Sequence, residues 1–442
     1  MKRLKKEKKI LQSPKGMRDI FDNDFYKMQG FFELAQEICV YYGFKPIETP
    51  VMEYGHIFEK GIGGYTDIVD KEMYYLKTKG GDSLVLRPEY TAGIIRAYIE
   101  HGMHNIHQPV QLYSFGPLFR HDRPQAGRYR EHRQFNMEII GSEKSVLDAM
   151  VIQVANLILA ESGIKNFRLL INSIGDRESR KEYIKKLVSF YKKNAGDLAA
   201  KDRARLTKNP LRILDSKEPE TIEVNQNVPQ ILNFLNNESK KHFEQVLEYL
   251  EHAGVYYQID HTLVRGQDYY SHTVFEFFAD PEREENDTDE EETGDKEVKL
   301  LSIGGGGRYD GLAEILGNKK PVPAVGCGLG LERILAITKK NLEPKIIKKA
   351  KIFFIQIGQE AKIKSFQIIE ILRNKKIPVH HSLSKDSLGS QLAAAEKMEV
   401  PYVIIFGQKE AMGNEVIVRN MTARSQKIVA ISKLADYLKG LK

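Results

Sequence analysis

The order of strands and helices changes near residue 348, and this change constrains the fold more than any other feature of the sequence. Before that point, short apolar strands follow one another with few helices between them, as in 73–77, 83–88, 110–120 and 134–141. From 348 to 442, strand-like and helix-like segments alternate. Successive strands favour an antiparallel sheet, whereas alternation favours an α/β sheet. We therefore predict an α+β domain on a mainly antiparallel sheet flanked by helices, followed by a small C-terminal α/β domain.

Three segments differ from this pattern. Residues 177–252 are charged and helical in character, so we predict a helical insertion there. Residues 1–15 are rich in lysine and predict a basic flexible tail. Residues 280–297 are strongly acidic and lie between two strands, which predicts a long solvated loop. The α+β domain is then expected to span 16–347 and the C-terminal domain 348–442.

The first helix and the strand after it can be placed more closely. Residues 24–43 carry apolar side chains at spacings of three and four and end at Gly43, which predicts an amphipathic helix with a glycine at its C-terminus. The next segment contains Pro46 and Pro50. Because proline lacks the N–H that a central strand donates, we expect this segment at a sheet edge or an interface.

Charge is unevenly distributed. The whole chain has a formal net charge of +7, but 280–297 hold eleven acidic and two basic residues. The C-terminal segment 348–442 holds 17 basic and eight acidic residues, and the tail 1–15 holds seven basic and one acidic. Basic segments suit a polyanionic partner such as nucleic acid, because binding releases counterions from phosphates. A surface that only keeps the protein soluble remains an open alternative.

Several classes of protein are excluded. No run approaches 18 consecutive apolar residues, so a transmembrane helix is not expected. The basic N-terminus lacks the apolar core and the cleavage site of a signal peptide. Two cysteines, Cys39 and Cys327, cannot form a disulfide framework or a zinc site. We predict a cytoplasmic protein with no membrane partner.

Arginines crowd the segment 119–138, which lies between two apolar strands. They are Arg120, Arg123, Arg128, Arg130 and Arg133. Guanidinium groups at this density repel one another unless an anion neutralises them, so a polyphosphate or a nucleic acid is the expected partner. A solvated hairpin without a ligand is the alternative.

Two glycine-rich segments suggest close approach of backbone and ligand. Gly326, Gly328 and Gly330 alternate before Arg333, which would clear one face of a strand for a flat ligand. Tight packing of that strand is an equally open interpretation. The segment GGGGRYDG at 304–311 lacks the Lys-Ser/Thr of a P-loop, so phosphate binding and close passage beside a substrate both remain open.

Together these motifs resemble the class II aminoacyl-tRNA synthetases and, within them, the histidyl-tRNA synthetase family. FRHD with GRYRE (119–131) resembles motif 2 of the class, GCGLGLER (326–333) resembles motif 3, and the helix and strand ending at Pro50 resemble motif 1, its dimer-interface element. LVRGQDYYSHTVFE (263–276) and GGGRYDGL (305–312) resemble the two signatures of the histidine enzymes. LRPEYTAG (86–93) and NPLRILDSK (209–217) match the same family, and all occur in its order.

The resemblance implies a fold and a function. It implies a class II synthetase catalytic domain, an insertion at about 177–252 that approaches the acceptor stem, and an anticodon-binding domain at 348–442. The family joins histidine to ATP as histidyl-adenylate and transfers the histidine to tRNA-His. ATP, Mg²⁺, histidine, tRNA-His and a second copy in a homodimer are therefore the implied ligands and partners, and no metal ligand is assigned to a protein side chain.

The resemblance also implies roles for particular residues. Arg120 and Arg265 would hold the α-phosphate from two sides, and Arg333 would pack against adenine and the outer phosphates. The implied ATP-binding set is Arg120, His132, Gly328, Gly330 and Arg333. The implied histidine-binding residues are Glu89, Thr91 and Gln134 for the amino group and Glu138, Tyr270 and Tyr309 for the imidazole. Arg123 and Gln125 would approach the acceptor end of the tRNA.

Three features depart from the family pattern. His132-Arg133 stand where the family usually has Phe-His, and the first of these positions is expected to stack on adenine. Tyr90 stands where glycine is common, so the adjacent turn is expected to differ. The acidic stretch 280–297 is longer than the usual hairpin.

Two rival functions can be weighed. The regulatory subunit of ATP phosphoribosyltransferase resembles the same catalytic domain and binds histidine, but it lacks the anticodon-binding domain. This chain keeps Arg120, Arg265, Arg333 and a full C-terminal segment. The class II enzymes for threonine, proline or glycine lack the two histidine signatures, and a threonine enzyme would also need zinc ligands.

Overall fold

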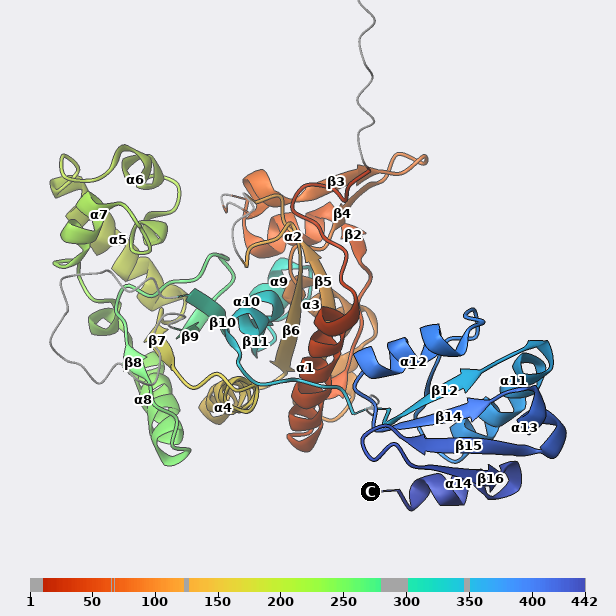
Figure 1. Cartoon of the computed structure of the whole chain (residues 1–442). Coiled ribbons are helices and arrows are strands. Elements are labelled where there is room, and N and C mark those ends of the chain that lie inside the picture. The colour runs from red at the N-terminus through yellow and green to blue at the C-terminus, as the bar shows by residue number, and fades with distance from the viewer. Residues whose placement is uncertain are drawn as a thin grey trace, which may run out of the picture. The chain divides into compact units, whose positions relative to one another are not determined.

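The protein is described by a computed structural model that covers residues 11–64, 66, 68–122, 127–279, 301–345 and 350–441. The chain separates into two compact units, Met1–Pro344 and Lys345–Lys442. Figure 1 shows both units, and each is described by itself. The expected tail 1–15, the acidic loop 280–297 and the boundary between 347 and 348 fall wholly or partly outside the described residues, so the expected domain limits stay predictions.

The first unit is built on an eight-stranded sheet with the order β1-β5-β6-β11-β10-β9-β7-β8. Its strands are β1 (Lys45–Pro46), β5 (Val110–Phe119), β6 (Glu131–Ile140), β7 (Phe167–Ser173), β8 (Gln258–Ile259), β9 (Ser271–Ala279), β10 (Leu301–Arg308) and β11 (Ala324–Gly330). The six inner strands pair antiparallel, and only the two-residue edge strands pair parallel. The predicted mainly antiparallel sheet is confirmed.

The two faces of this sheet differ because successive side chains of a strand point to opposite sides. On β6, the odd-numbered residues from Phe135 to Ile139 are buried in an apolar core. The helices that contribute to this core are α1 (Asp22–Tyr41), α4 (Ser145–Glu161), α8 (Asn237–His252) and α10 (Leu331–Ile337). The even-numbered residues from Gln134 to Glu138 are polar and point to the opposite face.

The segment after α1 lies at the edge of the main sheet, as its prolines predicted. Gly43 has φ of +88° and follows the end of α1, and Pro46 lies in the edge strand β1. A second, three-stranded sheet follows, formed by β2 (Met52–Tyr54), β3 (Tyr74–Lys77) and β4 (Ser83–Leu86). The helices α2 (Gly55–Ile62) and α3 (Thr91–Glu100) belong to a second apolar core.

The segment predicted as a helical insertion is helical. It contains α5 (Arg177–Lys193), α6 (Ala200–Arg205), α7 (Pro219–Asn225) and α8, with short 3-10 turns between them. The side chains of Asp176 and Asn236 accept hydrogen bonds from the backbone N–H groups of Ser179 and Ser239. These contacts cap α5 and α8, where helix N–H groups otherwise lack partners.

The second unit is an α/β domain, as predicted. Its sheet has the order β13-β12-β14-β15-β16. The strands are β12 (Ile352–Gln356), β13 (His380–His381), β14 (Tyr402–Phe406), β15 (Glu415–Asn420) and β16 (Gln426–Ala430). The helices are α11 (Gln359–Asn374), α12 (Leu388–Lys397), α13 (Gln408–Gly413) and α14 (Ile431–Lys439).

The helices of this unit cover both faces of its sheet (Figure 1). Along β12, Ile352 and Phe354 join a core with α11, α13 and α14, whereas Phe353 and Ile355 face α12. A strand whose two faces are both covered is apolar throughout, which is why this segment shows no polar alternation. In the described part of the chain, no helix is long and apolar enough to cross a membrane.

Candidate active site

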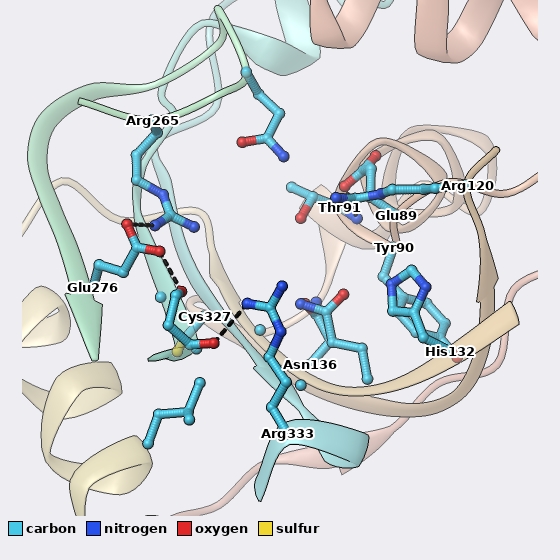
Figure 2. Close-up of a pocket in the computed structure, with 18 of the residues that line it drawn as sticks. Glu89, Tyr90, Thr91, Arg120, His132, Asn136, Arg265, Glu276, Cys327 and Arg333 are labelled. Carbon is cyan, nitrogen blue, oxygen red and sulfur yellow. Dashed lines mark hydrogen bonds and ion pairs between the residues drawn. The ribbon is translucent and has the colours of Figure 1, made fainter. Parts of the chain in front are cut away.

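A pocket opens on the polar face of the main sheet. It is lined by residues from the loop before α3, the segment after β5, the segment before β9, the strands β6, β9, β10 and β11, and the start of α10 (Figure 2). Most of the residues predicted for the site line it, namely Glu89, Thr91, Arg120, His132, Gln134, Arg265, Tyr270, Tyr309, Gly328, Gly330 and Arg333. Glu138 lies beneath them and contacts two of them. Arg123 and Gln125 lie outside the described residues.

The alternating glycines of β11 make room for side chains of the neighbouring strand. A Cβ at Gly326 would overlap the Glu138 carboxylate, and a Cβ at Gly328 would overlap the Gln134 amide. Both partners belong to β6, which pairs with β11 in register. At these two positions, the face of β11 that lacks side chains is therefore covered by side chains of β6. This favours the interpretation of tight packing there. At Gly330 the nearest atom is 3.7 Å from the Cβ position, so this end of the strand is the least crowded of the three positions.

The glycines of β10 do the same for a second pair of residues. A Cβ at Gly305 would lie 2.7 Å from Nη1 of Arg265, and a Cβ at Gly307 would lie 2.9 Å from the ring of Tyr270. Distances under about 3 Å are too short for real contacts, so each glycine is needed for its partner to lie flat on the strand. Close passage beside other side chains, and not a phosphate loop, explains this segment.

Three guanidinium groups enter the pocket from three segments. Nε of Arg120 donates to the carbonyl of Pro88 at 2.8 Å, and Nη1 of Arg333 donates to the carbonyl of Ser302 at 2.6 Å. Nη1 of Arg265 pairs with Glu276 at 2.9 Å. Figure 2 shows the last two groups on the same side of the pocket. The Arg265 guanidinium also lies 5.9 Å from the centroid of the Tyr270 ring. All three arginines line the pocket, where a guanidinium can donate to a ligand.

The electrostatic state of these arginines indicates an anion site. Burial lowers the pKa of Arg120, although Glu72 and Glu89 oppose the effect. Burial, Arg128 and Arg120 lower the pKa of Arg333. Like charges that are brought together out of water destabilise one another. A polyphosphate would relieve this repulsion, because charge-assisted hydrogen bonds to phosphate are strong.

A hydrogen-bond network surrounds the buried carboxylate of Glu138, which is 1% exposed. Its Oε1 accepts from the Thr91 hydroxyl at 2.7 Å and from the Asn136 amide at 2.7 Å. Its Oε2 accepts from the Tyr309 hydroxyl. Burial raises the pKa of Glu138 to about 7, although these three donors oppose the rise. The carboxylate can therefore change its charge near neutral pH.

Glu89 lies beside this network, two residues before α3 begins. Its two carboxylate oxygens accept hydrogen bonds from the backbone N–H groups of Thr91 and Ala92, at 2.6 and 2.8 Å. Negative charge is favoured at this position because helix N-terminal N–H groups lack internal partners. Burial nevertheless raises the pKa of Glu89. A cationic ligand beside Glu89 would stabilise its charged form.

The sequence of the chain is similar to the sequences of known proteins. The sequence matches the family described as histidyl-tRNA synthetase over residues 16–334, and an anticodon binding domain over 351–441. The histidine–tRNA ligase of Halothermothrix orenii is 38% identical over 438 residues, which is 98% of this chain and 99% of the relative. That of Geobacillus sp. is 36% identical over 430 residues, 97% of this chain and 98% of the relative. The chain belongs to the histidyl-tRNA synthetase family.

A solved structure agrees with this membership. The crystal structure of apo S. aureus histidyl-tRNA synthetase matches with a TM-score of 0.77 and 31% identity, covering 97% of this chain and 100% of that chain. The class II fold and the histidine–tRNA ligase activity expected from the motifs are confirmed. The regulatory-subunit alternative is less supported, because the relatives that match nearly the whole chain are named histidine–tRNA ligases.

Tyr90 and Arg133, which depart from the histidyl-tRNA synthetase family pattern, have local explanations. Tyr90 has φ of −96° and ψ of −35°, a backbone conformation open to any residue, so no glycine is needed. Its hydroxyl accepts from Arg87 at 3.0 Å. Arg133 donates its backbone N–H to both carboxylate oxygens of Glu332, at 3.0 and 2.9 Å, and this contact joins motif 2 to motif 3.

His132 stays neutral because it is buried among cations. Burial, together with Arg120, Arg333 and Arg128, lowers the pKa of His132 to about 3. A neutral imidazole is an aromatic ring without the charge that would oppose the neighbouring arginines. The ring can therefore take the stacking position that the histidyl-tRNA synthetase family usually gives to phenylalanine.

Several site residues of this histidyl-tRNA synthetase family member were missed by sequence reasoning. They are Asn136, Tyr269, Glu276 and Glu332, all of which line the pocket. Tyr269 adjoins a predicted residue, and Glu276 and Glu332 lie within recognised motifs, which could have indicated them. Asn136 has no such signal. In the described residues, no group of three or more His, Cys, Asp or Glu side chains could hold a metal ion.

Proposed function

We propose that the pocket condenses histidine with ATP and then transfers the histidyl group to the 3′ end of tRNA-His. In the first step the carboxylate of histidine attacks the α-phosphorus of ATP. A new P–O bond forms, and pyrophosphate leaves with the electrons of the bond that breaks. In the second step a ribose hydroxyl of the tRNA attacks the activated carbonyl, and AMP leaves. The convergence of three arginines beside the Glu138 network is the observation that carries this proposal.

Arg120, Arg265 and Arg333 are the groups we assign to ATP. The nucleophile and the triphosphate are both anions, so their approach needs fixed positive charge around the α-phosphate. Arg120 and Arg265 take the α-phosphate, and Arg333 takes adenine and the outer phosphates. Gly330 leaves room for the nucleotide, whereas Gly328 acts through its space for Gln134. No protein nucleophile is required for this reaction.

Histidine is recognised by the two carboxylates and their neighbours. Glu89, Thr91 and Gln134 are assigned to the α-ammonium, and Glu138, Tyr270 and Tyr309 to the imidazole. Because the Thr91 hydroxyl already donates to Glu138, it is left with lone pairs that accept from an ammonium. A pocket of buried polar groups rejects amino acids that leave those groups unpaired.

Mg²⁺ would enter with the nucleotide. In the described part of the pocket, the Glu276 carboxylate lies beside the arginines assigned to the phosphates, but it already pairs with Arg265 and accepts from the Ser302 hydroxyl, so we do not assign it to the ion. Mg²⁺ would be held by phosphate oxygens and water, which commonly fill most of its positions. When bound, the ion would offset phosphate charge in addition to the arginines.

The remaining partners rest on other parts of the chain. Arg123 and Gln125 are assigned to the tRNA acceptor end, and the second unit to the anticodon, which its basic composition supports. Exposed apolar side chains near motif 1, such as Tyr41 at 87% and Met52 at 53%, support a homodimer. Both cysteines are free and buried, which suits a reducing cytoplasm.

The activity is tested by exchange of labelled pyrophosphate into ATP. We expect exchange that depends on histidine and does not occur with threonine, proline or glycine. A folded protein that binds histidine without exchange would contradict the proposal and favour the regulatory-subunit function. Addition of tRNA-His should then yield histidyl-tRNA.

Replacing His132 by alanine should raise the KM for ATP by about tenfold, because stacking on an aromatic ring contributes roughly 1–3 kcal/mol per base. Phenylalanine at the same position should restore the KM. The exchange assay at varied ATP measures both, and the KM for histidine serves as the control. If the phenylalanine variant were as weak as the alanine variant, stacking would not be the role of His132.

A further inference from the structure

Asn136 occupies a central place in the polar face that no motif indicated. It lies on β6 between Gln134 and Glu138, so all three side chains share one face of the sheet. Its Cα partners are Ser114 on β5 and Gly328 on β11. The side chain is 4% exposed and lines the pocket. A buried amide at such a place must satisfy its hydrogen-bonding groups or destabilise the fold.

The Asn136 amide is directed at one substrate-binding carboxylate. Nδ2 donates to Oε1 of Glu138 at 2.7 Å, the oxygen that also accepts from Thr91. Oδ1 lies 3.2 Å from the Cβ position of Gly328, so the amide rests over a residue without a side chain. Any larger residue at 328 would compete for this space. The amide therefore needs residue 328 to lack a side chain, and it donates its hydrogen bond to the carboxylate.

The three donors to Glu138 come from three parts of the chain. Thr91 begins α3, Tyr309 follows β10, and Asn136 belongs to the same strand as Glu138. Thr91 and Tyr309 are also assigned to bound histidine, so their hydrogen bonds to Glu138 are shared with the substrate. Asn136 alone among these three has no assigned role toward the substrate. It is suited to hold the carboxylate while the other two adjust.

We propose that Asn136 is a positioning residue for histidine recognition, which fixes the orientation of the Glu138 carboxylate and favours its ionised form. The proposal rests on the proposed function, in which Glu138 accepts from the imidazole. Hydrogen bonds to a carboxylate stabilise the charged state relative to the protonated state. Loss of the Asn136 donor would therefore weaken the carboxylate as an acceptor and also loosen its orientation.

The ionisable groups that face Glu138 define how pH enters the test. They are Glu89, Tyr269, Tyr270, Tyr309 and Cys327. The pKa values of the three tyrosines and the cysteine are raised, so these groups stay neutral near pH 7. Glu89 accepts its hydrogen bonds from Thr91 and Ala92, so its effect on the pH dependence of the KM for histidine should be the same in all variants of Asn136. The titration of the free substrate, histidine, is also the same in assays of the wild type and of every variant.

The test compares Asn136→Ala and Asn136→Asp with the wild type in histidine-dependent ATP–pyrophosphate exchange. We expect the KM for histidine to rise about tenfold in the alanine variant, since a hydrogen bond to a charged group contributes roughly 1.5–3 kcal/mol and about 1.4 kcal/mol is tenfold. The KM for ATP and kcat should change little. The aspartate variant, which adds a like charge beside Glu138, should be weaker than the alanine variant.

The pH profile separates positioning from a merely structural role. A protonated Glu138 is a poorer acceptor, so the KM for histidine should rise as pH falls, with a midpoint governed by the pKa of Glu138. The midpoint should move to higher pH in Asn136→Ala and further in Asn136→Asp. Ser114→Ala is the matched control, because Ser114 is the cross-strand partner of Asn136, is 2% exposed and has a buried hydroxyl without a hydrogen-bond partner among the described residues.

The outcomes are distinct. A changed midpoint in both Asn136 variants, with an unchanged midpoint in Ser114→Ala, supports the proposal. If the Asn136 variants lose thermal stability but keep the wild-type midpoint and KM for histidine, the residue is structural only and the proposal is wrong. If wild-type protein shows no histidine-dependent exchange at all, it is the proposed function that fails. Histidine binding measured by calorimetry without ATP repeats the comparison for a variant with low turnover.

Discussion

Replacement of Arg265 by alanine is expected to lower the rate of histidyl-adenylate formation by on the order of 10³-fold, because it removes a fixed charge that stabilises the transition state. Nη1 of Arg265 pairs with Glu276, while Nε is buried without a hydrogen-bond partner among the described residues. Burial lowers the pKa of Arg265, but Glu276 and Tyr270 together raise it by more, so the net shift is upward. The guanidinium is therefore charged at every working pH, and its place in the pocket lining brings that charge to a phosphate.

The loss should appear in kcat for exchange and in single-turnover adenylate formation, whereas calorimetric affinity for histidine alone should change by less than about threefold. The reason is that the Glu138 network, which we assign to the imidazole, does not include Arg265. A comparable loss of histidine affinity would contradict an assignment to the phosphate.

A second variant controls for the charge that the substitution leaves behind. Without Arg265, the Glu276 carboxylate would stand near the incoming phosphates and repel them. Arg265→Ala combined with Glu276→Gln removes this repulsion and should recover part of the loss, about tenfold. Arg265→Lys keeps a positive charge but not the fork of donors, so we expect it to lie between wild type and alanine. If the double variant were no better than Arg265→Ala, repulsion by Glu276 would not contribute.

The sequence predicted the folds of both units because their determinants are local. The succession of strands with few helices between them predicted the antiparallel sheet, Gly43 marked the end of the first helix, and Pro46 placed its strand at the sheet edge. In the second unit, β16 and α13 show little signal in the sequence. Each is short, with five and six residues, so neither extends far enough for a clear periodic pattern.

Residues of the pocket could be predicted from the sequence only where they belong to a recognised motif. Alternating glycines showed that one face of β11 was bare, but not what filled it. The answer depends on β6 lying beside β11, a pairing between residues nearly two hundred positions apart, as in the contact between Arg133 and Glu332. Asn136 was missed for the same reason, since its role arises from the space over Gly328. The charge state of His132 likewise depends on arginines gathered by the fold.

The second large effect concerns the C-terminal unit. A protein that ends after Pro344 should lose on the order of a hundredfold or more in kcat/KM for tRNA aminoacylation, whereas its histidine-dependent pyrophosphate exchange should stay within about twofold of wild type. The truncation removes a segment, 348–442, with 17 basic and eight acidic residues. Each cation that contacts a phosphate contributes a counterion-release term to affinity, so the loss should shrink as salt increases.

The pocket should survive this truncation because the two units have separate cores. The apolar clusters that support the pocket contain only residues of the first unit, and those of the second unit contain only residues from 352 onward. Ending the chain after Pro344 also keeps Leu342, which is 4% exposed in the core beneath β11. Aminoacylation and exchange are compared at the same ionic strength, with thermal unfolding as the check on folding. Equal losses in both assays from a folded protein would show that the C-terminal unit supports the catalytic pocket and does not act mainly on the tRNA.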